Sequence, residues 1–240
     1  MKVMIADGEY MSRHIITQLF SKTDLEPVYV ENDVQAWNLL NSDEPPQLLI
    51  LDTKMANFDA MEICRKIREK SAARYIYIIL TVPPSNLANL LPGINAGADE
   101  FITKPFNRDE LWARVRVARR LLEKEKQLTT IIQSWLAMID NLPFGVACLG
   151  KNDEFLRVNK IFVELLGHEM KEILGKNLLN STLRRTTDLA RVRDGIRRRQ
   201  AFDWIEMEVY HKDGSKRTLV VWGRPINAGN LVFQIVTATE

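Results

Sequence analysis

The first half of the chain alternates short apolar runs with stretches in which apolar residues recur at helical spacing. The apolar runs cover residues 2–6, 27–30, 48–51, 76–80 and 101–103. The helical patterns that follow them cover residues 10–20, 34–40, 61–67, 87–91 and 111–122. Nearly continuous apolar strands that alternate with helices are typical of a parallel sheet covered on both faces. The pattern therefore predicts an α/β domain with five parallel strands.

Beyond Pro143 the pattern changes to extended runs separated by turn signals. Two short runs flank a turn at residues 151–153, and helical blocks at 159–166 and 169–174 each end at a glycine. An Asp-Gly hairpin signal joins the first two of three longer strands, which are expected over residues 204–211, 217–226 and 231–239. A further helical stretch is expected over roughly 188–199. These elements describe an α+β domain with a five-stranded antiparallel sheet and helices across one face.

A helical pattern without glycine joins the two halves, from Leu111 to Leu142. Its seven-residue register places Leu121, Leu128, Trp135 and Leu142 at one position and Ala118, Glu125, Ile132 and Ile139 at the other. This spacing favours a coiled coil that joins two chains. The alternative is that the two ends of the helix pack on the flanking domains. The predicted organisation is a domain over residues 1–122, a helical linker over 123–138 and a domain over 139–240.

Composition and charge narrow the class of protein. The chain holds 33 Lys+Arg and 31 Asp+Glu, so a net charge of +2 does not indicate a nucleic-acid partner. The arginine-rich segment from Arg184 to Arg199 contains no aromatic residues and is interpreted as a solvated helical face. Apolar runs are too short for a membrane span, and Met1 leads directly into a strand without a signal peptide. We expect a cytoplasmic protein without nucleic-acid or membrane contacts.

Four polar side chains stand where predicted strands end. Asp7 follows the first strand, Asp52 the third, Thr81 the fourth and Lys104 the fifth. Ligands of parallel sheets bind beyond the carboxyl ends of the strands, so we expect these side chains to converge. Carboxylate oxygens suit Mg²⁺, and a hydroxyl and an ammonium suit phosphoryl oxygens. An aspartate in this setting can be a nucleophile toward phosphorus.

The stretches KVMIAD, LLILDTKM, IILT and GINAGADEFITKPFNRDEL resemble the receiver domain of two-component response regulators, over residues 1–122. The resemblance implies a flavodoxin-like fold with strand order 2-1-3-4-5. It also implies a protein that is not itself an enzyme. In such a protein Asp52 accepts a phosphoryl group from a histidine kinase or a phosphotransfer protein. Asp7, Asp52 and the main-chain carbonyl of Lys54 are implied ligands of Mg²⁺.

The same resemblance assigns Thr81 and Lys104 to the phosphoryl oxygens and identifies Phe101 as the aromatic switch residue. One departure concerns the metal site, because Gly8 stands where the family usually has a second acidic residue. Glu9 follows and is the remaining candidate ligand of Mg²⁺, although its side chain should point elsewhere unless Gly8 lets the loop change shape. We therefore expect a weakened affinity for Mg²⁺. A receiver that is no longer phosphorylated, acting as a scaffold, is the alternative.

Residues 139–240 resemble a PAS domain in the stretches LPFGVACLGKNDEFLRVNKIFVELLGHEMKEILGKNL and YHKDGSKRTLVVWGRPI. The resemblance implies a sensory and dimerising module whose small-molecule ligand, if any, is not specified. His168 and His211 are both interpreted as exposed, and no cysteine lies in a flavin-binding motif, so neither haem nor flavin is expected. The whole chain is interpreted as a dimeric signalling adaptor. The enzyme alternative is the front part of a hybrid sensor kinase or other effector that continues past Glu240.

Overall fold

The computed structural model describes residues 1–70, 74–177, 192, 194–195, 198, 200–226 and 231–237. The chain forms two compact units, Met1–Ile131 and Ile132–Glu240. Most residues of the helix expected over 188–199, and most of the arginine-rich segment, lie outside the described residues. Within the described part of the chain, no helix combines the length and apolar character needed to cross a membrane.

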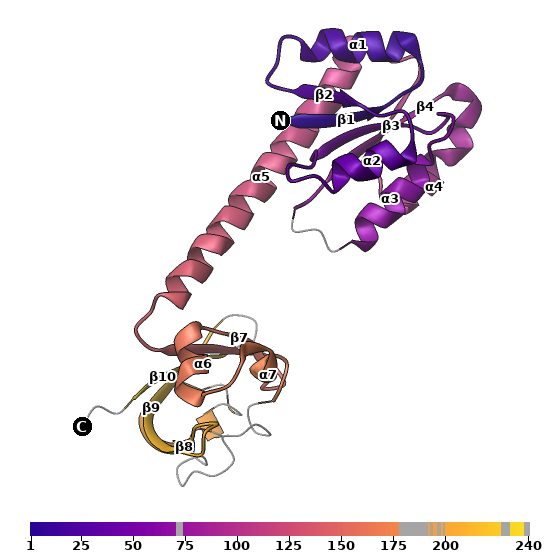
Figure 1. The fold of residues 1–240 in the computed structure, drawn as a ribbon. Helices are drawn as coiled ribbons and strands as arrows, with labels where there is room; N and C mark the ends of the chain where they lie inside the picture. The colour runs from indigo at the N-terminus through magenta and orange to yellow at the C-terminus, as the bar shows by residue number, and fades with distance from the viewer. Residues whose placement is uncertain are drawn as a thin grey trace. The chain divides into compact units, whose positions relative to one another are not determined.

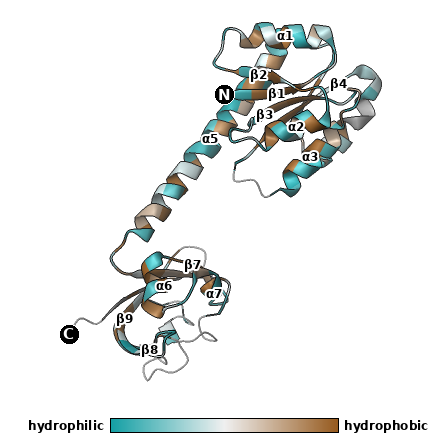
Figure 2. Ribbon diagram, viewed as in Figure 1, coloured by the Kyte–Doolittle hydropathy of each residue, from teal (hydrophilic) through white to brown (hydrophobic). Residues whose placement is uncertain are grey.

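The first unit contains a parallel five-stranded sheet in the order β2-β1-β3-β4-β5, which confirms the predicted fold (Figure 1). Its strands are β1 (Lys2–Ala6), β2 (Glu26–Tyr29), β3 (Leu48–Asp52), β4 (Tyr77–Val82) and β5 (Glu100–Thr103). Every residue of β3 and β4 is buried, as expected for strands that are covered on both faces. The central strands are accordingly among the most hydrophobic parts of this unit (Figure 2).

Helices cover both faces of this sheet. They are α1 (Tyr10–Phe20), α2 (Asp33–Leu40), α3 (Ala60–Glu69), the 3₁₀ segment η1 (Pro84–Asn89), α4 (Leu90–Asn95) and α5 (Arg108–Asp140). Apolar residues of α1 and α5 share one buried cluster, and those of α2 and α3 share the other. The helix predicted over residues 87–91 is wrong in extent, because a 3₁₀ turn precedes an α-helix that starts at Leu90. Pro92 lacks an N–H group and is tolerated only near a helix start, which places it in the first turn.

The α5 helix runs without interruption for 33 residues, as the sequence predicts for most of its length. Asn107 precedes it and accepts a hydrogen bond from the Glu110 N–H at 2.8 Å. Ala118 is completely buried in the core of the first unit and cannot contribute to a seam between two chains. The predicted register is therefore wrong at this position. Farther along the helix, large apolar side chains are exposed, namely Leu121, Leu128, Ile132 and Trp135.

The second unit contains an antiparallel five-stranded sheet in the order β7-β6-β10-β9-β8. Its strands are β6 (Gly145–Leu149), β7 (Phe155–Val158), β8 (Phe202–Tyr210), β9 (Lys216–Pro225) and β10 (Leu231–Thr237). Two short helices, α6 (Lys160–Leu166) and α7 (Met170–Ile173), accompany the sheet. Phe155, Phe162, Val221 and Ile235 belong to a single buried cluster.

The interpretation of His168 and His211 as exposed is wrong. Their side chains are only 15% and 17% exposed. Gly167 ends α6 in the left-handed conformation, and the His211 ring lies so close that a Cβ at this position would approach its Nε2 to 2.1 Å. The β8–β9 hairpin packs against the end of α6, where the Lys212 N–H donates to the Leu166 carbonyl at 3.2 Å and the His211 ring lies against Gly167. In the sequence, His168 follows a helix break and His211 precedes a hairpin, and neither position indicates a tertiary contact.

Candidate phosphoacceptor site

The four polar residues predicted at strand ends lie together at the carboxyl edge of the parallel sheet. Asp52 and Thr81 are register partners on β3 and β4. The Lys104 Nζ lies 2.7 Å from Asp52 Oδ2 and 2.9 Å from Asp7 Oδ1. All four residues are buried, the most exposed being Lys104 at 7%. Strand order explains the arrangement, since β1, β3, β4 and β5 are consecutive in the sheet.

Burial sets the electrostatics of this cluster. Desolvation raises the pKa of Asp7, although the hydrogen bond from Lys104 opposes that rise. Desolvation also lowers the pKa of Lys104, but its hydrogen bonds to Asp52 and Asp7 outweigh this effect and raise the pKa above its ordinary value. The Lys104 ammonium group is therefore held in its charged form by the Asp52 and Asp7 carboxylates, to which it donates hydrogen bonds. A charged ammonium beside Asp52 is suited to bind an anionic group there.

Two buried oxygen atoms of the site lack a hydrogen-bond partner among the described residues. They are Thr81 Oγ1 and Asp7 Oδ2. Leaving a buried polar atom unsatisfied costs about 1–3 kcal/mol. The Asp7 oxygen still lies 2.9 Å from the Lys104 ammonium, so its charge is partly compensated. A phosphoryl oxygen near Thr81 and a cation near Asp7 would each satisfy one of these atoms.

The connecting loops hold the carboxylates through main-chain hydrogen bonds. The Lys54 N–H donates to Asp52 Oδ1 and the Glu9 N–H donates to Asp7 Oδ1, each at 2.9 Å. The Thr53 N–H donates to the Thr81 carbonyl at 3.1 Å. Phe101 is half-buried on β5 and packs against the cluster formed with α2 and α3. The loop after β3 therefore places the main chain of Lys54 directly beside the Asp52 carboxylate.

The Glu9 side chain turns toward the site, which is the outcome that the sequence left open for a loop that changes shape at Gly8. Its Oε2 lies 3.3 Å from the Lys104 Nζ. The same oxygen accepts a hydrogen bond from Ser12 Oγ at 3.0 Å, and Ser12 is buried. Ser12 is the site residue that sequence reasoning missed. Its only signal was its position three residues beyond Glu9 at a helix start, where side chains face each other.

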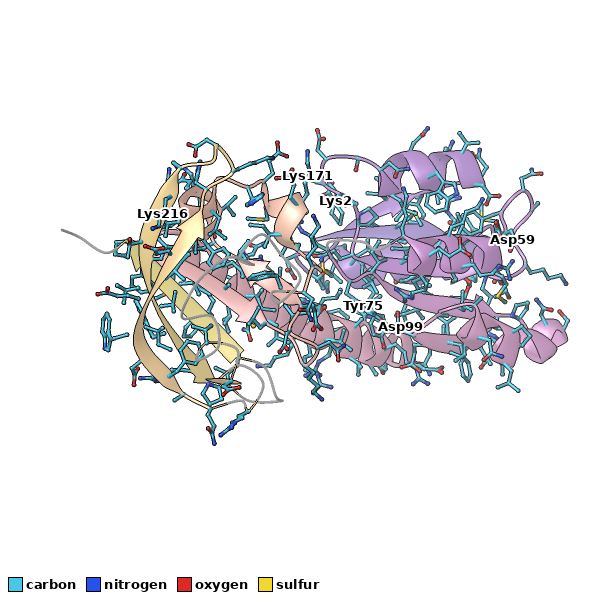
Figure 3. All side chains as sticks on the ribbon, turned by 90° about the horizontal axis from the view of Figure 1, so that it is seen from below. Lys2, Asp59, Tyr75, Asp99, Lys171 and Lys216 are labelled. Carbon is cyan, nitrogen blue, oxygen red and sulfur yellow. The ribbon has the colours of Figure 1, made fainter. Side chains whose placement is uncertain are left out.

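A second polar cluster, partly buried at the opposite edge of the sheet, differs in that its members are hydrogen-bonded to one another. Asp99 accepts hydrogen bonds from Tyr75, Arg68 and the Ile78 N–H, the last at 2.7 Å. Figure 3 labels Tyr75 and Asp99. Arg68 also donates to the carbonyls of Ile76 and Gly97, each at 2.8 Å. Burial, followed by the hydrogen bond to Asp99, raises the pKa of Tyr75 to about 12. This network braces α3 against β4 and β5, whereas the cluster around Asp52 keeps oxygens free for a ligand.

The donor set around Asp7 fits a hard divalent cation. Carboxylate oxygens are the ligands that such a cation prefers, and those of Asp7, Asp52 and Glu9 each lie within 3.3 Å of the Lys104 ammonium. Asp7 Oδ2 is buried without a hydrogen bond. Within the described residues, no three acidic, histidine or cysteine side chains already form a metal-binding group. The Lys104 ammonium pairs with all three carboxylates and occupies the position of a counter-ion between them. A bound Mg²⁺ would share that role.

Comparison with known proteins identifies the first unit. The model of the response regulator receiver domain matches residues 3–116. A probable transcriptional regulator ycf27 of Galdieria sulphuraria is 31% identical over 193 residues, which is 80% of this chain and 72% of that protein. The response regulator ArlR of Staphylococcus epidermidis is 34% identical over 124 residues. That match covers 51% of this chain and 54% of the ArlR length.

Solved structures resemble each unit at a lower level. The receiver domain of a putative Luxo repressor protein from Vibrio parahaemolyticus has a TM-score of 0.48, with 20% identity, and covers 53% of this chain and 95% of that one. The PAS domain of an HTR-like protein from Haloarcula marismortui has a TM-score of 0.41, with 19% identity. That match covers 48% of this chain and 98% of the PAS domain chain. A TM-score below 0.5 does not establish a shared fold. The family match, the curated relatives and the parallel sheet agree, and the chain belongs to the response regulators, with the receiver domain of two-component signalling in its first half.

Proposed function

We propose that the chain is a phosphoacceptor signalling protein in which Asp52 receives a phosphoryl group from a histidine kinase or a phosphotransfer protein. The observation that carries this proposal is the pairing of Asp52 with the Lys104 ammonium at 2.7 Å, beside the unsatisfied hydroxyl of Thr81. A nucleophilic carboxylate, a cation and a hydroxyl donor are the groups that phosphoryl transfer requires.

In the proposed transfer, a carboxylate oxygen of Asp52 forms a bond to phosphorus while the phosphorus–nitrogen bond to the donor histidine breaks. The product is an acyl phosphate. Lys104 then pairs with a phosphoryl oxygen instead of the neutralised carboxylate, and the Thr81 hydroxyl donates to another. Mg²⁺, when bound, supplies charge neutralisation for the phosphoryl oxygens. Asp7, Asp52 and the main-chain carbonyl of Lys54 would hold it.

Phe101 is the proposed switch residue that reports the phosphorylation of Asp52. It is half-buried, and its register partner on β4 is Leu80, the neighbour of Thr81 in sequence. A shift of Thr81 toward a phosphoryl group would alter the packing next to this ring. The aromatic side chain would then turn farther into the core.

Intact-mass measurement with a small phosphodonor such as acetyl phosphate and Mg²⁺ tests the proposed phosphoacceptor. We expect one phosphoryl adduct on the full chain and none on Asp52→Asn. Asp59→Asn is the matched control, because it removes an exposed carboxylate and keeps a side chain that can cap α3. An adduct that persists in Asp52→Asn contradicts the assignment. Wild-type protein that remains unmodified at every Mg²⁺ concentration instead supports a phosphorylation-silent scaffold.

For the second half we propose a PAS sensory module over residues 139–240, joined to a receiver over 1–122 by a helical linker over 123–138. Its support is the five-stranded antiparallel sheet with short helices α6 and α7. His168 lies 3.4 Å from Glu172 and His211 lies 2.9 Å from Asp213. Because both imidazoles already contact carboxylates, we propose a module without haem or flavin, although a small colourless ligand is compatible with it. A visible absorption band after expression with cofactor supply would contradict this.

We further propose that the chain is a homodimer joined through α5. Leu128, Ile132 and Trp135 are between 56% and 61% exposed and recur at coiled-coil spacing. Burying each such side chain is worth about 1.5–3 kcal/mol. We expect the wild type to scatter light as a dimer at tens of micromolar and the double variant Leu128→Glu/Ile132→Glu to be a monomer.

Thr130→Glu/Gln133→Glu is the matched control for the dimer, since it adds the same two charges at exposed positions outside the seam. We expect this control to stay dimeric. A dimeric Leu128→Glu/Ile132→Glu variant would remove α5 from the interface. We do not propose a nucleic-acid partner for this chain. The relative from Galdieria sulphuraria is named a probable transcriptional regulator, but this name applies to the relative alone.

A further inference from the structure

We infer that Glu9, held in place by Ser12, replaces the second acidic side chain that Gly8 lacks, so that it would add a third carboxylate to the proposed Mg²⁺ site once the cation is bound. This inference rests on the proposed phosphoacceptor function of Asp52. It makes Glu9 a ligand of the cation. It also makes Ser12 the residue that orients Glu9.

Glu9 contacts Lys104 and Asp7 directly and is linked to Asp52 only through Lys104. Its Oε2 lies 3.3 Å from the Lys104 Nζ, which lies 2.7 Å from Asp52 and 2.9 Å from Asp7. Its own N–H donates to Asp7 at 2.9 Å. A hydrogen bond of 3.0 Å from the buried Ser12 hydroxyl fixes the carboxylate on this side of the helix start. Glu9 therefore shares one cation with both of the buried aspartates.

The absence of a side chain at position 8 has no steric cause. A Cβ built on Gly8 would meet only Met55 Cγ, at 3.8 Å, which is an ordinary van der Waals contact. Gly8 is also not among the glycines with a positive φ, so its backbone conformation is open to other residues. An aspartate would fit at this position. The missing carboxylate is thus a chemical difference of this chain, which a neighbouring group can compensate.

Side-chain length explains why Glu9 can compensate. A glutamate is one methylene longer than an aspartate and can reach an ion from one residue farther along the chain. The Glu9 side chain is 52% exposed, so it forms the solvent side of a site whose floor consists of the buried Asp7 and Asp52. Three carboxylates and one ammonium leave a net charge of −2 to attract a dication. That is the charge of a site with an acidic pair at positions 7 and 8.

Isothermal titration calorimetry with MgCl₂ on the full chain tests this inference. We expect Glu9→Gln to weaken Mg²⁺ binding about 10-fold, which corresponds to about 1.4 kcal/mol. Ser12→Ala, which only releases the Glu9 carboxylate, should weaken binding by a smaller factor. Gly8→Asp/Glu9→Gln should restore wild-type affinity, because an aspartate at position 8 supplies the lost charge. Glu69→Gln, which removes an exposed carboxylate at the end of α3, should leave the affinity unchanged.

The outcomes separate this inference from the proposed function. If the wild type binds Mg²⁺ and Glu9→Gln binds it equally well, Glu9 is not part of the metal site and the inference is wrong. The proposal that Asp52 is phosphorylated would not be contradicted by that result. If the wild type does not bind Mg²⁺ and Gly8→Asp does, Glu9 fails to replace the missing carboxylate and the inference is wrong. Phosphoryl adduct formation on Asp52, measured by mass in the same preparations, then decides the proposed function independently.

Discussion

Replacing Lys104 by methionine removes the only cation that pairs with Asp7 and Asp52 in the described structure. Methionine keeps an unbranched side chain of similar length, so the change is mainly one of charge. The Lys104 Nζ lies 2.7 Å from Asp52 and 2.9 Å from Asp7, and both aspartates are almost completely buried. Without the ammonium, two buried carboxylates repel each other and have no counter-ion. We therefore expect the first unit to lose stability at neutral pH.

The size of this loss follows from the ion pairs. At an effective dielectric constant of about 20, a charge pair at these distances is worth roughly 6 kcal/mol before desolvation is counted. Removing one partner of a buried pair costs about 3–5 kcal/mol once desolvation is included. We expect the free energy of unfolding to fall by about 3 kcal/mol. Mg²⁺ at about 100 times its Kd should return about 2.7 kcal/mol, because it binds only the folded site.

Amide hydrogen exchange of peptides from β1 and β3 measures this free energy within the full chain. Lys66→Met is the matched control, because Lys66 forms an exposed ion pair with Glu62 on α3, and such a solvent-screened pair contributes little to stability. Mg²⁺ should stabilise Lys104→Met more than the wild type, in which the cation competes with the ammonium. A loss no larger than that of Lys66→Met, or a larger Mg²⁺ effect on the wild type, would refute the reasoning.

Two further predictions concern groups buried in each unit. Burial raises the pKa of Asp7, so the ionisation of this carboxyl group opposes folding. The protonated carboxyl group stabilises the folded state at low pH, and this stabilisation is lost as the pH rises through the folded-state pKa. Without Mg²⁺, Asp7→Asn should therefore be more stable than the wild type at pH 7, as measured by hydrogen exchange of β1. The difference in stability should vanish below the ordinary pKa of an aspartate. A wild type that is more stable than Asp7→Asn at pH 7 would contradict this prediction. Asn159 accepts hydrogen bonds from Val146 and Phe162 and donates to the carbonyls of Ile139 and Phe144. Asn159→Ala should cost about 3–5 kcal/mol, since several polar groups become unsatisfied, as measured by hydrogen exchange of β6; unchanged exchange would exclude this role.

The convergence of Asp7, Asp52, Thr81 and Lys104 could be predicted from the sequence because parallel strands place their carboxyl ends at one edge. Apolar runs located the strands, and the residue after each run was then bound to lie at that edge. The five-stranded antiparallel sheet was predictable for a similar reason, since alternation and turn residues are local signals. These properties depend on residues that are neighbours in sequence.

Contacts between segments that are distant in sequence could not be predicted. Ala118 fits a coiled-coil register as well as a helix packed on a sheet, because both use nearly the same spacing of apolar residues. Only the packing of α5 in the first unit buries it. Similarly, the His211 ring lies against Gly167 because the β8–β9 hairpin meets the end of α6.

At the site itself, Glu9 illustrates which properties follow from the sequence and which depend on the tertiary structure. The sequence by itself determined that a carboxylate follows Gly8, and that Asp7 and Lys104 end two strands of one sheet. Whether the Glu9 side chain turns toward Lys104 depends on the start of α1 and on the hydroxyl of Ser12. Side-chain direction at a helix start is set by a balance of hydrogen bonds and ion pairs, each worth about 1 kcal/mol. Only the tertiary structure, which brings Lys104 to the Asp7 loop, decides that balance.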